Sequence, residues 1–263
     1  MKIVILCGGQ GTRLREETEF KPKPMVEIGG KPILWHIMKT YSYYGFNDFV
    51  LCLGYKGEMI KQYFCNYEIL NNDFSVELGQ GTLQLNTRHA EEGWKITFAE
   101  TGEGSMTGSR VKQVQKYVGD ETFMLTYGDG VTDLDIRSLL EYHQSHGRTG
   151  TVTGVLPESR YGELIIEDDH VLAFDEKPVR KNLISGGYFV FNPGIFGYLK
   201  EDENCILERE ALHHLAKDNQ LKVFKHDGFW QCMDTYRDYK YLQDLWEKGN
   251  PAWTKWQQKQ TVS

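Results

Sequence analysis

The sequence lacks the features that mark exported, membrane-spanning and disulfide-rich proteins. Its N-terminal apolar run, Ile3 to Cys7, is five residues long, which is too short for a signal peptide. No stretch approaches the roughly 20 apolar residues that a membrane-spanning helix needs. The five cysteines are scattered, without a C-x-x-C pair, so neither a disulfide framework nor a zinc site is indicated. We therefore expect a reduced, soluble, cytoplasmic protein.

Positive charge is also sparse and dispersed. The formal net charge is −7 and no long basic block is present, which argues against nucleic-acid polymers and anionic membranes as partners. One small phosphorylated ligand is still compatible, because it needs only a few well-placed cations. The 263 residues contain no internal repeat and no Gly/Ser linker, so we expect one compact domain over residues 1–263.

The first part of the sequence alternates short buried strands with amphipathic helices. Residues 2–6 and 49–53 are apolar runs typical of buried strands. Residues 31–44 carry apolar side chains at helical spacing, and a second helix is expected over 58–67. This order predicts an α/β fold with a Rossmann-like, mixed but mostly parallel sheet and helices on both of its faces.

Residues 74–100 interrupt this pattern. They alternate apolar and polar side chains around glycines, which predicts an antiparallel β-ribbon inserted into the α/β fold. The elements expected after the ribbon are a helix over 110–117, a strand over 123–127, a helix that Asp133 caps and that reaches about His143, short strands from 151 to 191, and a helical tail.

The segment "LCGGQGTRLREETEFKPKP", residues 6–24, combines glycines, prolines and cations after the first predicted strand. Neither common phosphate-binding fingerprint fits it, because Leu14 replaces a required glycine and the Gly-Lys-Ser/Thr of a Walker A loop is absent. Glycine amides still approach an anion closely, and the planar guanidinium group of Arg13 can bind a phosphate with two hydrogen bonds. The flanking prolines stiffen the backbone around Lys23. An ordinary tight turn with a solvated basic loop is the alternative; the nearby cations favour phosphate binding.

A longer segment resembles a known family signature. "LCGGQGTRLREETEFKPKPMVEIGGKPILWHIM" closely resembles that of the sugar nucleotidyltransferases, L-x-G-G-x-G-T-R-L followed by K-P-K-P. The resemblance covers nearly the whole chain, because "YGDGVTDLDI", "SRYGELIIEDDHVLAFDEKP", "SGGYFVFNP" and "GFWQCMDTYRD" look like family segments in the expected order. The phrases "VEIGGKPILWHIM", "SMTGSR" and "FWQCMDTYRD" look most like the branch that makes CDP-glucose from CTP and glucose 1-phosphate.

The resemblance implies a nucleotide pocket at the glycine loop. It assigns catalysis to Arg13, Lys23 and Asp129, which would act by positioning and charge neutralisation. The loop 101–110 is rich in glycine and hydroxyl residues, and Arg110 in it matches a nucleotide-binding arginine of the family. The nucleotide-binding set is Leu6, Gly8, Gly9, Gly11, Thr12, Arg13, Lys23, Arg110 and Gly128.

Two aspartates match the metal ligands of the family and imply Mg²⁺ as the cofactor. Asp129 stands in "TYGDG" at the carboxyl end of a predicted strand, where open α/β sheets place their ligands. On residue type alone a Gly-Asp-Gly turn fits Asp129 as well, and no spacing argument brings Asp234 close to it. The adjacent histidines His213 and His214 point to different sides of a predicted helix, and we assign them no metal.

The sugar-phosphate pocket is likewise implied by resemblance. Glu176 would accept hydrogen bonds from sugar hydroxyls and Lys177 would meet the sugar phosphate, although "FDEKP" also fits a charged hairpin end stopped by proline. Glycines would form the walls, where they permit close approach. The sugar-phosphate set is Tyr161, Gly162, Glu176, Lys177, Gly186 and Gly187.

The implied reaction is a single in-line displacement of pyrophosphate from CTP by glucose 1-phosphate. Residues 1–140 would mainly bind the nucleotide and residues 141–240 the sugar phosphate, followed by an aromatic tail over 241–263. A UTP- or dTTP-dependent transferase and a non-catalytic nucleotide-sugar sensor remain open. An NAD-dependent oxidoreductase is excluded, because Leu14 occupies the place of the third glycine in the dinucleotide-binding fingerprint.

Homo-oligomers, and hexamers in the CDP-glucose branch, are the assemblies that the resemblance implies, with a role in deoxysugar or O-antigen-type lipopolysaccharide synthesis. The ribbon at 74–100 and the aromatic tail are candidate interfaces. The tail residues Trp246, Trp253 and Trp256 are of the kind that anchors a terminal segment to the core or to a neighbouring subunit. Cys7 is expected to be a small buried residue.

Overall fold

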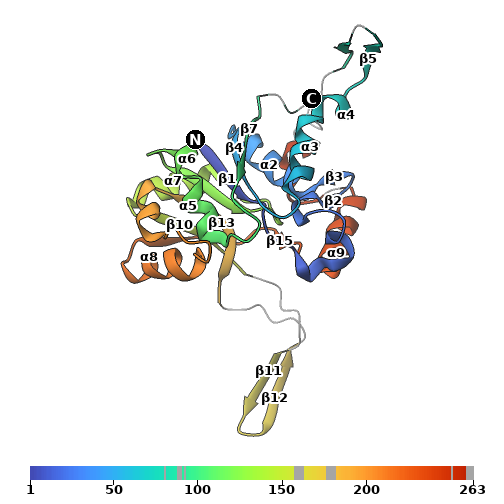
Figure 1. Cartoon of the computed structure of the whole chain (residues 1–263). Coiled ribbons are helices and arrows are strands. Elements are labelled where there is room, and N and C mark those ends of the chain that lie inside the picture. The colour runs from blue at the N-terminus through green and yellow to red at the C-terminus, as the bar shows by residue number, and fades with distance from the viewer. Residues whose placement is uncertain are drawn as a thin grey trace.

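The computed structural model describes residues 1–79, 81–87, 91, 93–156, 163–175, 182–249 and 251–258. A seven-stranded sheet forms its centre, in the order β14-β10-β13-β8-β1-β4-β7 (Figure 1). β13 runs antiparallel to both neighbours and the other pairings are parallel, which confirms a mixed, mostly parallel sheet. The strands are β1 (Lys2–Leu6), β4 (Asp48–Leu53), β7 (Lys95–Glu100), β8 (Phe123–Tyr127), β10 (Gly150–Val155), β13 (Ile184–Phe191) and β14 (Leu221–His226).

Helices cover both faces of the sheet, as expected. Successive side chains of a strand alternate, so Ile3 and Ile5 of β1 enter one core while Val4 and Leu6 enter the other. The first core receives side chains from α2 (Ile33–Tyr43), α3 (Gly57–Cys65), α7 (Ile136–His146) and α9 (Tyr236–Glu247). The second receives them from α5 (Thr107–Gln113), α6 (Gln115–Val118) and α8 (His213–Lys217).

The remaining elements of the body are short. They are α1 (Arg15–Thr18), α4 (Tyr67–Asn71), α10 (Lys255–Gln258), the 3-10 turns η1 (Thr12–Leu14), η2 (Lys23–Met25) and η3 (Pro193–Tyr198), the π-helical turn η4 (Glu208–Leu212), and the paired strands β2 (Glu27–Ile28) with β3 (Lys31–Pro32) and β9 (Gly130–Thr132) with β15 (Trp230–Cys232). Among the described helices, none has the length and apolar character needed to traverse a membrane.

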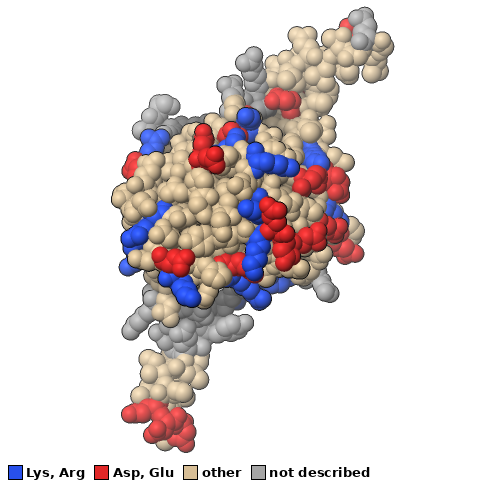
Figure 2. All heavy atoms as spheres, turned by 60° about the vertical axis from the view of Figure 1, so that its left-hand side comes forward, with Lys and Arg blue, Asp and Glu red and all other residues tan. Residues whose placement is uncertain are grey.

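Two hairpins project from the body in opposite directions (Figure 1). They are β5 (Phe74–Glu77) with β6 (Thr82–Leu85) and β11 (Glu163–Glu167) with β12 (His170–Asp175), both antiparallel. On the face drawn in Figure 2, basic and acidic side chains are interspersed over the body, and acidic side chains gather at the tip of the lower projection.

Part of the predicted ribbon belongs to the main sheet. β5 and β6 pair as expected, but β7 runs parallel to β4 at the edge of the sheet. Phe98 of β7 packs on α3, where its ring is 6.3 Å from that of Phe64, and most of the strand is partly exposed. An edge strand of this kind has the same alternating pattern as a ribbon. The prediction that the ribbon reaches residue 100 was therefore wrong.

The cap of α7 also differs from the prediction. Asp135 caps the helix, and its carboxylate accepts a hydrogen bond from the Ser138 amide at 2.9 Å. Asp133 instead pairs with Nε2 of His226 at 3.0 Å. Burial acts to raise the pKa of Asp133, but His226 outweighs it and holds that pKa below its ordinary value. A partner so distant in the sequence leaves no local signal.

The aromatic tail packs on the core, which confirms its anchoring role. Trp253 is fully buried, and its Nε1 donates to Nδ1 of His36 at 3.3 Å. Nε2 of His36 lies 2.9 Å from the carbonyl oxygen of Ile28. Burial lowers the pKa of His36 to about 4, so the ring is neutral and carries its proton on Nε2. The rings of Trp246 and Trp256 pack against the same histidine.

Candidate active site

The glycine loop follows β1, an interior strand of the sheet that lies between β8 and β4. Gly11 has a φ of +64°, and a Cβ there would lie 3.0 Å from Thr18 and 3.1 Å from Lys23, so the position requires glycine. Thr18 closes the loop, because its hydroxyl lies 3.0 Å from the carbonyl oxygen of Gly11 and 2.7 Å from that of Leu14. Cys7, at the base of the loop, is 1% exposed, as expected for a small buried residue.

Lys23 lies between two aspartates. Pro22, which precedes η2 with a φ of −69°, and Pro24 within η2 flank it, and its side chain is 9% exposed. Its Nζ lies 2.6 Å from Oδ2 of Asp129 and 2.6 Å from Oδ1 of Asp234. Burial acts to lower the pKa of Lys23, but the carboxylates outweigh it and raise that pKa above its ordinary value. The lysine is therefore a fixed positive charge.

A short ladder brings Asp234 to Asp129. β15 pairs antiparallel with β9, which directly follows Asp129, and the Met233 amide donates to the Asp129 carbonyl at 2.8 Å. On the other side, Thr235 and Asp238 form a capping box at the start of α9. The Asp234 amide donates to Oδ2 of Asp238 at 3.1 Å. The backbone of Asp234 is thus fixed on both sides.

Arg13 adds a second cation at the rim of the site. Its Nη1 lies 2.6 Å from Oδ2 of Asp234, and its side chain is 74% exposed. An exposed ion pair contributes little to stability, so the arginine can exchange this partner for another anion at small cost. With Lys23 and Asp129, the cluster has two cations and two carboxylates and no formal net charge.

Three side chains at this point offer atoms that bind metals. The carboxylates of Asp129 and Asp234 and the thiol of Cys232 lie within 4.8 Å of one another. The two carboxylates fit Mg²⁺, and the ammonium of Lys23 marks the position that a cation favours between them. Cys232 was not predicted from the sequence, although residues two apart in an extended segment share one side. Burial, reinforced by Asp129, raises the pKa of the Cys232 thiol well above its ordinary value.

A pocket of about 340 Å³ opens beside this cluster, between the glycine loop, the end of β8 and the start of α5. All residues predicted to bind the nucleotide line it, namely Leu6, Gly8, Gly9, Gly11, Thr12, Arg13, Lys23, Arg110 and Gly128. Asp129 lines it as well. Its wall also includes residues that were not predicted to bind the nucleotide, namely Cys7, Pro24, Ser105, Met106, Thr107 and Tyr127.

Arg110 supports the glycine loop from behind. The helix expected over 110–117 begins three residues earlier and divides into α5 and α6, which places Arg110 inside α5 with its side chain buried. Its Nη atoms donate to the carbonyl oxygens of Gly8 at 3.1 Å and Leu53 at 2.9 Å. They also reach the Thr101 hydroxyl at 2.7 Å. A Cβ at Gly8 would overlap the guanidinium, so this glycine makes room for the arginine.

Two of the predicted sugar-pocket residues, Gly186 and Gly187, lie on β13 beside the end of β8. Gly187 has a φ of +77°, and a Cβ there would meet the ring of Tyr127. The carbonyl oxygen of Gly186 accepts a hydrogen bond from Nε1 of Trp230 at 2.7 Å. The other predicted residues, Tyr161, Gly162, Glu176 and Lys177, lie outside the described residues.

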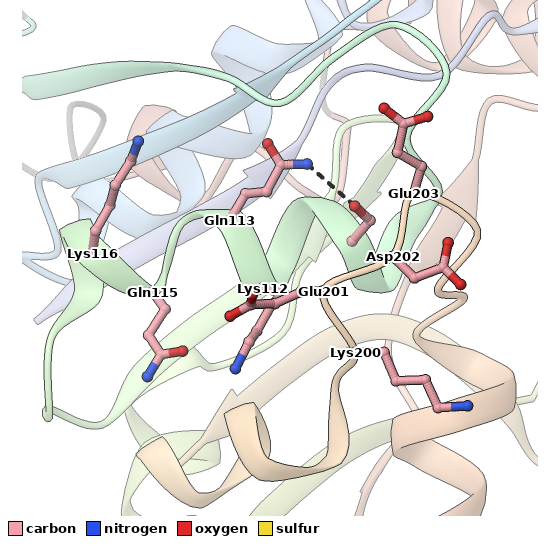
Figure 3. Close-up of a pocket in the computed structure, with 9 residues that line it drawn as sticks. Lys112, Gln113, Gln115, Lys116, Lys200, Glu201, Asp202 and Glu203 are labelled. Atoms are coloured by element: carbon pink, nitrogen blue, oxygen red, sulfur yellow. Dashed lines mark hydrogen bonds between the residues drawn. The ribbon is translucent and has the colours of Figure 1, made fainter.

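A larger hollow, of about 620 Å³, lies on the outer side of α5 (Figure 3). Charged residues of α5, α6 and segment 200–203 line it, and none of the described residues predicted for the site does. Nε2 of Gln113 lies 3.2 Å from the hydroxyls of Ser105 and Ser109 and 3.0 Å from the Thr101 carbonyl. Gln113 therefore braces, from outside, the loop that lines the pocket.

Comparison with known proteins agrees with this geometry. The model of the nucleotidyl transferase family matches residues 2–247. Glucose-1-phosphate cytidylyltransferases of Salmonella typhi and Salmonella typhimurium are each 49% identical over 259 residues, which is 98% of this chain and 100% of each relative. The solved structure of HddC from Yersinia pseudotuberculosis, complexed with GMP-PN, is similar with a TM-score of 0.66, 26% identity and coverage of 93% and 99% of the two chains. The chain therefore belongs to the nucleotidyl transferase family.

Proposed function

We propose that the protein transfers a cytidylyl group from CTP to α-D-glucose 1-phosphate, giving CDP-glucose and pyrophosphate. The observation that carries this proposal is Lys23 held by Asp129 and Asp234 at the wall of the glycine-loop pocket. The two Salmonella relatives are named for this transfer. We also propose that it takes place in the cytoplasm and that the product serves deoxysugar or O-antigen-type lipopolysaccharide synthesis.

Mg²⁺ is the cofactor that we propose, with Asp129 and Asp234 as its protein ligands. When bound, Mg²⁺ supplies charge neutralisation for the phosphates of both substrates. The two carboxylates already hold the Lys23 ammonium, at 2.6 Å from each. Lys23 must therefore withdraw from at least one of them when a metal ion binds. The pocket wall on which it lies would then offer it the phosphates of the nucleotide.

The triphosphate of CTP would be held by the glycine loop and Arg13. A Cβ position at Gly9 has no atom within 4 Å, so this part of the loop borders open space that a phosphate can enter. Arg13 is exposed, so its guanidinium group can exchange Asp234 for the leaving pyrophosphate. Arg110 keeps the loop in place through the Gly8 carbonyl, and its position on the pocket wall supports its assignment to the nucleotide.

Glucose 1-phosphate would lie on the β13 side of the pocket. There we propose Gly186, Gly187, Tyr161 and Gly162 as walls, Glu176 as the acceptor of sugar hydroxyls and Lys177 as the contact of the sugar phosphate. The phosphate oxygen attacks the α-phosphorus of CTP, and the bond to pyrophosphate breaks. No general base is needed, because a phosphomonoester with a second pKa of about 6 is mostly dianionic at neutral pH.

We further propose that the protein assembles as a homo-oligomer, a hexamer by resemblance to its branch of the family. The support is the β11–β12 hairpin, whose apolar side chains are 54% to 66% exposed: Leu164, Ile165, Ile166, Val171, Leu172 and Phe174. Apolar surface of this extent usually becomes an interface. Sedimentation velocity should therefore show an oligomer that Ile166→Lys weakens; a wild-type monomer would refute the proposal.

The reaction is tested by measuring pyrophosphate release with Mg²⁺, glucose 1-phosphate and one of CTP, UTP, dTTP, GTP or ATP at a time. We expect a clear preference for CTP, which Asp129→Asn reduces together with the response to added Mg²⁺. Release with UTP or dTTP instead would keep the mechanism and overturn the choice of base. If the protein binds nucleotide but releases no pyrophosphate, with glucose 1-phosphate or with other sugar 1-phosphates, the result would favour a non-catalytic nucleotide-sugar sensor.

A further inference from the structure

Cys232 belongs to the metal-capable cluster, yet the proposed transfer gives it no task. It ends β15, where it pairs with Gly130. Its sulfur lies within 4.8 Å of a carboxylate oxygen of both Asp129 and Asp234. Within the described part of the chain, this is the single group of three His, Cys, Asp or Glu side chains that meets in this way.

The two carboxylates near the sulfur already hold a cation. Lys23 places its Nζ between the carboxylates. The thiol side chain is partly exposed, so a cation that replaces the ammonium has a path to it. The cluster therefore presents two oxygens and one sulfur within 4.8 Å of one another.

This donor set suits two classes of metal differently. Mg²⁺ takes oxygen ligands and keeps several waters, so it gains nothing from the sulfur. Zn²⁺ and other thiophilic cations bind thiolate as well as carboxylate, with bonds of about 2.0–2.3 Å. A third protein ligand of the softer kind thus adds affinity for these cations alone.

We propose that this cluster is also a binding site for a thiophilic divalent cation such as Zn²⁺, held by Asp129, Asp234 and the sulfur of Cys232. The inference rests on the metal site proposed above for the two carboxylates. As the metal–sulfur bond forms, the S–H bond breaks and its proton passes to solvent, and the Lys23 ammonium leaves the carboxylates. Such a cation competes with Mg²⁺ and inhibits the enzyme, because its third ligand holds it in place.

The test uses Cd²⁺ as the probe, because a cadmium–thiolate bond absorbs in the ultraviolet. Titration of the purified wild-type protein without substrates should produce this band up to one equivalent of Cd²⁺. Cys232→Ser should lose the band. The matched control is Cys65→Ser, because Cys65 is exposed and lies on α3, outside the cluster. A band that survives in Cys232→Ser, vanishes in Cys65→Ser or never forms would overturn the proposal.

A second measurement needs no variant. Alkylation of the wild-type cysteines with iodoacetamide, followed by mass spectrometry, gives the rate at each thiol. Cd²⁺ should slow alkylation of Cys232 and leave Cys65 unchanged; equal rates at Cys232 with and without Cd²⁺ would refute the inference even if Cys232→Ser were unfolded.

Inhibition connects the site to the reaction. At fixed Mg²⁺, we compare the Zn²⁺ concentrations that halve the uninhibited rates of the wild type and of Cys232→Ser. This concentration should be ~10-fold or more higher for Cys232→Ser, the usual scale for weakening a metal site. An unchanged value would refute inhibition through the sulfur. Wild-type protein that forms the cadmium band but shows no Mg²⁺-dependent transfer would instead contradict the proposed function and leave the thiophilic site standing.

Discussion

The Nζ atom of Lys23 lies 2.6 Å from Oδ2 of Asp129, although 106 positions separate the two residues in the sequence. The same atom is 2.6 Å from Oδ1 of Asp234. An ammonium in this position offsets the repulsion between two carboxylates and at the same time competes with any metal ion for them. Lys23 therefore has two separable effects. It stabilises the negative charge of the phosphates, and it lowers the affinity of the two carboxylates for a metal ion.

Replacing Lys23 by methionine should separate these effects. Turnover should fall by ~10²-fold or more, because a charge stabiliser is lost. The affinity for Mg²⁺ without nucleotide should rise, because the competing ammonium is gone. Pyrophosphate release and titration calorimetry measure the two quantities, with Lys61→Met on α3 as the control. Weaker Mg²⁺ binding in Lys23→Met would show that the ammonium does not compete with the metal.

Arg13→Ala should affect catalysis without affecting stability. Turnover should fall by ~10²-fold, the usual scale for losing a group that stabilises developing charge. The free energy of unfolding should change by less than about 0.5 kcal/mol, because the arginine side chain of the ion pair with Asp234 is largely exposed and Lys23 still pairs with that aspartate. Kinetics and denaturant unfolding measure both. Turnover within a few-fold of wild type would mean that Arg13 is misassigned.

Local and non-local features of this site differ in how far the sequence predicts them. β1, α2 and the glycine loop were predictable, because each is continuous and its burial pattern repeats every two residues or every turn. The contact between Lys23 and Asp234 depends on the β9–β15 ladder of three residue pairs, which is too short to leave a periodic signal. Resemblance to the family alone supplied Asp234, and Cys232, two positions before it, was missed.

Gln113→Ala should weaken nucleotide binding from outside the pocket. Gln113 holds Thr101, Ser105 and Ser109 through its amide nitrogen, so its loss frees the loop that lines the pocket. The loss of about 1 kcal/mol of hydrogen bonding should raise the KM for the nucleotide by about fivefold with little change in kcat. Gln115→Ala in the same hollow is the control. A fall in kcat at unchanged KM would contradict this role.

Acid should destabilise the protein through His36. Its pKa is lowered from 6.5 to about 4, because the ring is buried. The unfolded chain therefore binds a proton at this position below a pH of about 6.5, whereas the folded chain does not until about pH 4. The contribution of the neutral His36 ring to the free energy of unfolding is complete above pH 6.5 and is lost as the pH falls toward 4. It amounts to something on the order of 3 kcal/mol.

The measurement is urea unfolding at several pH values between these limits. His36→Gln should reduce the slope of unfolding free energy against pH, and His213→Gln, an exposed histidine on α8, should leave it unchanged. His143 and His146 also have lowered pKa values and add to the wild-type slope, so the comparison rests on the difference between variants. Equal slopes in wild type and His36→Gln would contradict the prediction.

Gly8→Ala and Gly9→Ala should fail in different ways, although the two glycines are adjacent. A Cβ at Gly8 would overlap the buried guanidinium of Arg110, so the first variant should lose about 2 kcal/mol or more of unfolding free energy. A Cβ at Gly9 meets no atom within 4 Å, so the second should keep its stability. That methyl group would instead stand in the space assigned to phosphate and raise the KM for CTP. Thermal unfolding and initial rates distinguish the outcomes, and unimpaired CTP binding in Gly9→Ala would place the triphosphate elsewhere.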